Sequence, residues 1–203
     1  YNNIVASGAN ATILHYNENN AVMKDGDLLL IDAGAEHDWY ACDVTRTFPV
    51  NGRFSKQQRA LYEVVLEAQL KAIAHVQPGV SFVSVHETAL RALIDGLVHL
   101  GLLRGSVDEQ LKKDDYRRFY MHRTSHWLGL DVHDCGAYNV DGTSRRLEAG
   151  MVLTVEPGLY VAEDDTTVGP EWRGIGIRIE DDVLVTSHGH EVLTTGIPKT
   201  VEE

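Results

Sequence analysis

The first part of the chain alternates between polar turns and apolar runs whose length fits β-strands. Residues 27–34 contain an unbroken apolar run between two aspartates, which predicts a buried strand. Residues 39–48 mix aromatic, β-branched and polar residues and predict an antiparallel partner for it. A turn at His37-Asp38 would join the two strands into a hairpin.

The middle of the chain shows the apolar spacing of amphipathic helices. The first predicted helix opens with Ser55 and Gln58, the spacing of a capping box, and Pro78-Gly79 ends it. The second predicted helix opens with Ser84 and Glu87, which have the same spacing. The positions expected to face the core are Leu61, Val64, Val65, Ala68 and Ala72 in the first helix and Ala89, Leu90, Leu93, Ile94 and Leu97 in the second.

The pattern changes again near residue 120. A short, charged helical stretch over 107–118 is followed by four predicted strands, at 121–134, 151–156, 174–185 and 191–193. Glycine and proline residues mark the turns between these strands. An order of strands, helices and strands predicts an α+β fold, in which helices pack on one face of a curved, mostly antiparallel sheet.

Composition then narrows the range of partners. The chain has 203 residues and a formal net charge of −12, so a single domain is the default and no nucleic-acid partner is expected. The acidic balance also disfavours a membrane surface, and no apolar run approaches the ~20 residues of a spanning helix. The two cysteines, Cys42 and Cys135, are too few for a disulfide scaffold and favour a reducing, cytoplasmic location.

Four carboxylates interrupt the apolar strands. Asp32 and Glu156 end apolar runs, whereas Asp43 and Glu180 lie inside predicted strands. With a turn at His37-Asp38, Asp32 would lie directly opposite Asp43, and two carboxylates that close repel each other unless a cation lies between them. Each residue alone could be a turn residue or part of a solvated edge. Together they predict a cation site, because burying a carboxylate without a partner is costly.

A histidine-rich segment, residues 122–134, offers a nitrogen donor to the same site. One histidine with four carboxylates is a hard donor set, which favours manganese or a similar divalent ion over a sulfur-rich zinc site. The four negative charges match two divalent cations, and a paired-metal site suits amide hydrolysis. Gly176 shares a strand face with Glu180 and would leave room there for a ligand or another backbone.

Five segments resemble proline-specific metallopeptidases of the creatinase/aminopeptidase fold. The amino-acid sequence of residues 125–134 is most similar to that of the aminopeptidase P (Xaa-Pro aminopeptidase) group of that family. The segments occur in the family order and cover nearly the whole chain, so the match is far more specific than a lone short motif. They are Ile31–Gly34, Asp43–Pro49, His122–Asp134, Thr154–Tyr160 and Gly174–Asp181.

The resemblance implies a pita-bread fold with two divalent metal ions, most often manganese, with cobalt, zinc or iron as alternatives. By position, the metal ligands would be Asp32, Asp43, His126, Glu156 and Glu180, of which Asp43 and Glu180 would bridge the metals. The implied substrate is a peptide with proline at its second position. A hydroxide that bridges the metals would attack the carbonyl before proline, and Glu156 would accept the proton.

The resemblance also implies roles around the metals. His133 would hydrogen-bond the substrate carbonyl and its developing oxyanion. His15 and His122 would line the substrate side of the site, and a purely structural role is the alternative for each. Arg178 would orient substrate or ligands.

Two features depart from the family pattern. This chain has Arg123 where the family usually has glycine, so the approach to the metals or the substrate preference is expected to differ. Full-length relatives also carry an amino-terminal domain that contributes to the active-site mouth and to the oligomer. Residues 1–203 are therefore expected to be one catalytic metallopeptidase domain without that domain and without the start of the catalytic domain. A homo-oligomer is expected for the full-length protein.

Other functions remain open on the sequence alone. A prolidase-type Xaa-Pro dipeptidase would use the same five ligands. A methionine aminopeptidase would use them too, but it lacks the wording of residues 126–134. A non-catalytic peptide-binding module on the same fold is the third alternative, although relatives that lost catalysis generally lost ligands.

Overall fold

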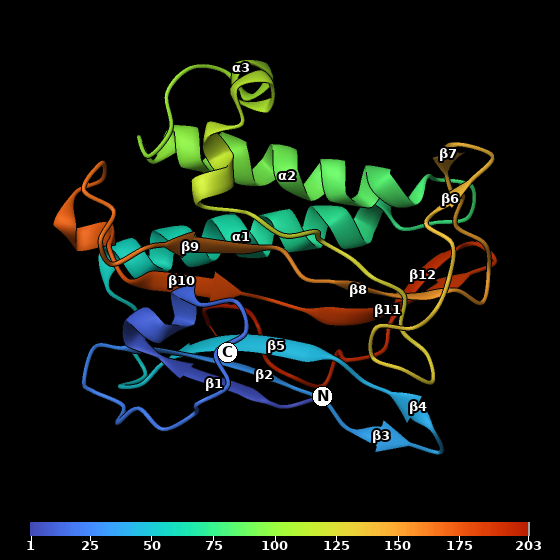
Figure 1. The fold of residues 1–203 in the computed structure, drawn as a ribbon, viewed down its shortest axis with the longest axis horizontal. Helices are drawn as coiled ribbons and strands as arrows, with labels where there is room; N and C mark the ends of the chain where they lie inside the picture. Colours follow the sequence, from blue (N-terminus) through green and yellow to red (C-terminus); the bar gives the residue numbers. More distant parts are fainter. Residues whose placement is uncertain (203) are drawn as a thin grey trace.

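The computed structural model describes residues 1–202 and shows the predicted α+β architecture (Figure 1). The helical elements are η1 (Gly8–Thr12), α1 (Lys56–His75), α2 (Phe82–His99), α3 (Val107–Lys113), η2 (Asp115–Arg118) and η3 (Pro170–Trp172). The strands are β1 (Ile4–Ser7), β2 (Leu28–Ala33), β3 (Glu36–His37), β4 (Tyr40–Ala41), β5 (Val44–Pro49), β6 (Asn139–Val140), β7 (Thr143–Ser144), β8 (Val152–Val155), β9 (Gly158–Val161), β10 (Ile175–Arg178), β11 (Asp181–Thr186) and β12 (Gly189–Val192).

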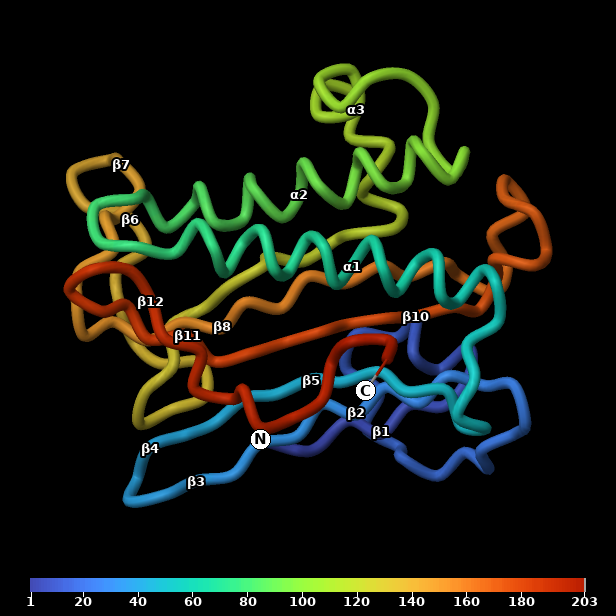
Figure 2. Tube along the Cα trace, turned by 180° about the vertical axis from the view of Figure 1, so that it is seen from behind, coloured from blue at the N-terminus to red at the C-terminus, as the bar shows by residue number. Residues whose placement is uncertain are grey.

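The two long helices lie together on one side of the strands (Figures 1 and 2). α1 packs on β8, β9 and β10, and α2 packs on α1. The apolar positions predicted to face the core are buried, except for Val64, which is half-buried and packs against the core. Within residues 1–202 no helix is both long and apolar enough to cross a membrane.

The strand ladders are antiparallel and are interrupted at the residues of greatest chemical interest. β5 pairs with β2, and β2 pairs with β1. β8 pairs with β11 and β9 with β10, so a gap at Glu156-Pro157 faces a gap at Ile179-Glu180. Across the second gap the backbone N–H of Glu180 donates to the carbonyl of Thr45 at 3.0 Å, which joins this part of the sheet to β5. The predicted single strand over 174–185 is therefore two strands.

The capping prediction is confirmed for the first helix but wrong for the second. At α1, Ser55 and Gln58 form both hydrogen bonds of the capping box. α2 begins three residues earlier than predicted for a helix capped by Ser84, with Ser81 as its N-cap. The Ser84 hydroxyl donates to the carbonyl of Ser81 at 2.6 Å, inside the first turn, and so cannot act as a cap.

The predicted hairpin register is wrong by two residues. The chain turns at Asp38-Trp39, which have positive φ angles of 49° and 71°, rather than at His37-Asp38. Asp32 therefore pairs with Thr45 and not with Asp43. Side chains alternate along a strand with a period of two, so the shift leaves Asp32 on its predicted face.

Most of the strand predicted over 121–134 is a loop. The segment runs beside β8 for a few residues only, where the N–H of Thr154 donates to the carbonyl of His126 at 3.0 Å and the N–H of Glu156 donates to that of Thr124 at 2.8 Å. One isolated bridge joins Trp127 to Leu153. The short pairing fixes His126 beside β8 and leaves the residues after it free to form the cavity wall.

The room that Gly176 leaves on β10 is filled by backbone. A Cβ atom at this position would lie 2.1 Å from the carbonyl oxygen of Ala11 in η1. The space was predicted to hold a ligand or another backbone, and the second alternative is correct. The close approach holds η1, and the chain that leads from it to His15, against β10.

Candidate metal centre

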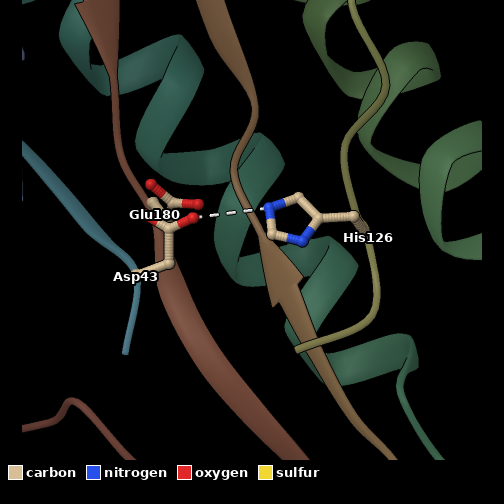
Figure 3. A group of neighbouring side chains, drawn as sticks. All are labelled: Asp43, His126 and Glu180. Atoms are coloured by element: carbon tan, nitrogen blue, oxygen red, sulfur yellow. Dashed lines mark ion pairs between the residues drawn. The ribbon is translucent and has the colours of Figure 1, made fainter. Parts of the chain in front are cut away.

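Three potential metal ligands converge from distant parts of the sequence. Oxygen atoms of Asp43 and Glu180 and a ring nitrogen of His126 all lie within 4.8 Å of one another. Figure 3 shows the two carboxylates side by side, with the imidazole of His126 directed at them from another chain segment. Asp43 precedes β5, Glu180 lies in the gap between β10 and β11, and His126 lies in the loop beside β8. The three residues lie where the pairing of the strands is interrupted, and there their side chains point toward one another.

Hydrogen bonds orient each of the three groups. The Thr45 hydroxyl donates to Oε2 of Glu180 at 2.5 Å, and the backbone N–H of Asp43 donates to Oδ2 of Asp182 at 3.2 Å. Nδ1 of His126 lies 3.0 Å from the carbonyl oxygen of Trp127, which can only accept a hydrogen bond. Nδ1 therefore carries a proton, and Nε2 is the nitrogen that faces the carboxylates. In the metal-free protein Nε2 donates to Asp43, and a metal ion would take the place of that proton.

Glu156 extends the group on the side of β8. Its Oε1 lies 3.6 Å from Nε2 of His126, and its Oε2 lies 4.0 Å from Nδ1 of His122. Burial raises the pKa of Glu156 to about 7, against the lowering effect of His126. A carboxyl group with this pKa can hold or release a proton near neutral pH.

Asp32 lies at the other side of the group and is held by two neighbours. Arg178 donates to its Oδ2 at 2.6 Å. The Tyr1 hydroxyl lies 3.0 Å from Oδ1 of Asp32 and 2.7 Å from Oδ1 of Asp43, so one phenol contacts both carboxylates. Burial, hydrogen bonding to Asp43 and the nearby negative charges raise the pKa of Tyr1. Tyr1 therefore stays protonated, as a donor must.

The four carboxylates, here called the acidic centre, are Asp32, Asp43, Glu156 and Glu180. Burial and the charges of Glu156 and Asp43 raise the pKa of Glu180 well above its usual value. Burial also raises the pKa of Asp32, despite its ion pair with Arg178. Burial would raise the pKa of Asp43 as well, but hydrogen bonds from His126 and Tyr1 lower it overall. One arginine and one histidine cannot neutralise four clustered carboxylates, so the donor set fits divalent cations.

A cavity of about 790 Å³ opens onto the acidic centre. Its wall includes all the residues that sequence analysis placed in the site, namely Asp32, Asp43, His126, Glu156, Glu180, His15, His122, His133 and Arg178. The rings of His126 and His133 meet edge to face with centroids 4.4 Å apart. Nε2 of His122 lies 2.9 Å from the Tyr160 hydroxyl, and burial lowers the pKa of His122 to about 4. His122 is therefore a neutral ring at pH 7, whereas His15 and His133 are exposed at the cavity wall.

Three further residues contact the charged groups but were not singled out from the sequence. Tyr1 and Thr45 hold carboxylates of the acidic centre, as described above. The Tyr160 hydroxyl accepts from Nη1 of Arg178 at 3.1 Å. Thr45 contacts Glu180, and Tyr160 contacts Arg178, so each contact joins two segments that are separated in the sequence. The alternation of residues along a single strand does not reveal such contacts. The pattern Arg178-Ile179-Glu180 was the available signal, since it marked β10 as a strand with a polar face.

The family model of metallopeptidase family M24 matches residues 1–187. The chain belongs to this family, and its fold is the pita-bread fold. It is 54% identical over its whole length to the Xaa-Pro aminopeptidase of Escherichia coli and 53% identical to that of Haemophilus influenzae, and it covers 46% and 47% of those proteins. The chain thus spans about half the length of the curated relatives it matches.

Solved structures agree with this assignment. An aminopeptidase of Pseudomonas aeruginosa, described as PepP, superposes with a TM-score of 0.98 at 60% identity. A variant of Escherichia coli aminopeptidase P in complex with substrate superposes with a TM-score of 0.95 at 53% identity. In both cases the match covers all of this chain and 46% of the solved chain.

Proposed function

We propose that this chain carries the active site of a metal-dependent aminopeptidase that hydrolyses the bond between an N-terminal residue and a following proline. The observation that carries the proposal is the convergence of Asp43, His126 and Glu180 in the wall of one cavity, with both carboxylates buried. The names of the relatives support the substrate class, because several of them are Xaa-Pro aminopeptidases.

Five residues would hold two divalent cations, with manganese as our first choice. They are Asp32, Asp43, His126, Glu156 and Glu180, and the proposed bridging ligands are Asp43 and Glu180. The hard oxygen donors favour manganese over softer ions, and cobalt, zinc and iron are alternatives. When bound, the pair would lower the pKa of a water molecule and polarise the carbonyl that precedes proline.

The residues of the chain itself would then manage the protons and the substrate. Glu156 would accept the proton of the attacking water, because its carboxylate lies at the proposed metal site, 3.6 Å from Nε2 of His126. His133, at the cavity wall beside His126, would donate to the carbonyl oxygen as negative charge develops on it. His15 and the neutral ring of His122 would line the substrate side. Arg178 would hold Asp32 in place through their 2.6 Å contact.

The first experiment combines metal analysis with a peptide assay. Protein reconstituted with manganese should contain about two metal ions per chain and release alanine from Ala-Pro-Ala. The Asp43→Ala variant should lose metal and activity together. A matched variant, Asp38→Ala, removes a carboxylate from an exposed turn and should keep both. Metal-loaded protein that leaves the tripeptide intact would contradict the proposal.

Substrate length separates the proposal from its nearest alternative. A prolidase-type enzyme would prefer the dipeptide Ala-Pro over Ala-Pro-Ala, whereas an aminopeptidase would prefer the longer substrate. Binding of both peptides without hydrolysis, in protein with its full metal content, would favour a non-catalytic module.

Both cysteines are free, which supports our proposal of a reducing, cytoplasmic environment.

A further inference from the structure

A second hollow of about 530 Å³ adjoins the cavity of the metal centre. It lies between α2 and residues 116–123, with one residue of α3 in its wall. The two cavities share wall residues, which are Val83, His86, His122 and Arg123. A ligand that leaves the acidic centre past His122 would therefore enter this second cavity.

Three arginines line the second cavity, although the chain has a net charge of −12. The charged residues in its wall are Arg91, Arg117, Arg123 and Glu87. Arg91 pairs with Asp108 at 3.0 Å and Arg117 pairs with Asp114 at 3.2 Å, so both have an acidic partner on the protein. In the part of the chain that the structure describes, the exposed guanidinium of Arg123 makes no hydrogen bond or ion pair. Arg123 is the cation that remains available to a ligand.

The wall beside Arg123 is fixed and uncharged. Nδ1 of His86 lies 2.8 Å from the Thr124 hydroxyl, which lies 2.6 Å from the hydroxyl of Tyr120. Burial, followed by the charges of Arg123 and Arg117, lowers the pKa of His86 to about 4. His86 is therefore neutral at pH 7 and adds no charge of its own, so the cationic character of this wall comes from arginine.

The geometry of an aminopeptidase substrate decides what would reach Arg123. Such a substrate has a single residue before the bond that is cleaved. Any part of it that extends beyond His122 must therefore belong to the residues after proline. An acidic side chain or the terminal carboxylate of those residues matches the charge and the fork of hydrogen-bond donors that a guanidinium offers.

We propose that the second cavity is a binding subsite for the carboxyl-side residues of peptide substrates, and that Arg123 selects peptides with an anionic group there. The inference rests on the proposed function, because it assumes that the substrate amino terminus lies at the acidic centre. It assigns the preference to one residue and to one kind of ligand charge.

The test uses pentapeptide amides that differ only in charge. The reference is Ala-Pro-Gln-Gln-Gln-amide, and glutamate replaces glutamine at the third, fourth or fifth position. At low salt, glutamate in at least one position should raise kcat/KM by about three- to tenfold, mainly through a lower KM. The gain should shrink at high salt, because exposed charges are screened.

Variants of the chain then assign the effect. Arg123→Gln should remove the preference for glutamate, and Arg123→Glu should reverse it. Arg53→Gln removes the same charge from an exposed arginine outside both cavities and should retain the preference. Equal kcat/KM for all the peptides in the unmodified protein, or a preference that survives in Arg123→Gln, would overturn the inference.

A binding arm keeps this result separate from the proposed function. The same peptides, with a neutral fluorophore at the carboxyl end, are titrated onto metal-loaded protein and followed by fluorescence anisotropy. If no peptide is cleaved, the proposed function fails, yet the ratio of dissociation constants still measures the charge preference. If glutamine and glutamate peptides are cleaved equally well, the proposed function stands and the inference about Arg123 fails.

Discussion

Glu180 and Asp181 are neighbours in the sequence and are both fully buried, but their surroundings are opposite. Glu180 faces the other carboxylates, and its pKa lies well above its usual value because of burial and their charges. Asp181 accepts hydrogen bonds from Arg46 at 2.8 Å and from Lys199 at 2.5 Å. Burial would raise the pKa of Asp181, but hydrogen bonds from Lys199 and other neighbours lower it overall.

The difference between the two sites separates a structural charge from a functional one. The Asp181 cluster, which consists of Asp181, Arg46, Gln69, Thr194 and Lys199, supplies its own counter-charges. The acidic centre has too few positively charged neighbours to balance its four carboxylates. A buried carboxylate therefore does not by itself indicate a metal site, whereas a buried carboxylate without a counter-charge does. Variants on each side can test this distinction.

The largest expected effect is on catalysis at the acidic centre. Glu180→Gln keeps the side-chain shape and an oxygen for the Thr45 hydroxyl, but it removes a charged ligand. We expect kcat/KM on an Xaa-Pro peptide to fall by about 10³-fold or more, as for the loss of a central catalytic group. The metal-free variant should unfold at the same or a higher urea concentration, because the folded protein no longer has to bury an ionisable carboxyl group among other carboxylates. A variant with unchanged metal content and activity would remove Glu180 from the site.

The matching change in the Asp181 cluster should lower the stability of the protein rather than its activity. Asp181→Asn leaves Arg46 and Lys199 without their buried counter-charge, and we expect a loss of about 3–5 kcal/mol in the free energy of unfolding. Urea denaturation measures this loss, with Asp38→Asn on an exposed turn as the control, expected within about 0.5 kcal/mol of the parent. Folded Asp181→Asn protein should still bind metal. Loss of metal without loss of stability would abolish the distinction.

The stabilisation of the protein by metal should depend on pH, because protons and metal ions compete for the acidic centre. Since the folded-state pKa of Glu156 is raised from 4.5 to about 7, the folded protein retains a proton that the unfolded chain releases. The metal-free protein should therefore lose stability as pH rises from about 4.5 toward 7. Manganese at about a hundredfold excess over its dissociation constant should raise Tm at pH 7.5 by roughly 5–10 °C, and by much less at pH 5. Differential scanning calorimetry would contradict this if the gain were the same at both pH values.

The smallest expected effect is a change in kcat/KM, and two threonines on the same face of β5 provide the comparison that tests it. The Thr45 hydroxyl donates to the Glu180 carboxylate, whereas the Thr47 hydroxyl donates to the carbonyl oxygen of Arg178 at 3.0 Å. Thr45→Val should lower kcat/KM by about tenfold, as for other groups that orient metal ligands. Thr47→Val should change kcat/KM by less than about twofold, although each variant should lose about 1 kcal/mol of stability. Equal activities would show that the Thr45 contact does not position Glu180.

Local patterns in the sequence predicted much of the fold. The capping box at Ser55 and the apolar face of α1 are local features, and both are confirmed. The start of α2 was wrong because Ser84 bonds within its own turn instead of capping. The hairpin register was wrong because Asp38 and Trp39 both adopt positive φ, which residue preferences do not indicate for tryptophan.

The candidate site divides in the same way. Its carboxylates were recognised because each interrupts an apolar strand, and the structure brings them to one cavity. Their individual roles as ligands stay predictions. The contacts of Tyr1 and Thr45 were not predictable, since they depend on segments that meet only in the folded chain. The Asp181 cluster was not predictable for the same reason, because Arg46 belongs to β5 and Lys199 to the segment after β12.

The close approach of Gly176 to Ala11 also limits how this protein can evolve. A methyl group at position 176 would meet the Ala11 carbonyl oxygen at 2.1 Å, so β10 tolerates no side chain there while η1 keeps its place. His15 follows η1 closely, and its position in the cavity wall depends on the same contact. A side chain at position 176 would therefore have to displace the backbone of η1, and such a shift would reshape the cavity wall without altering any of the four carboxylates.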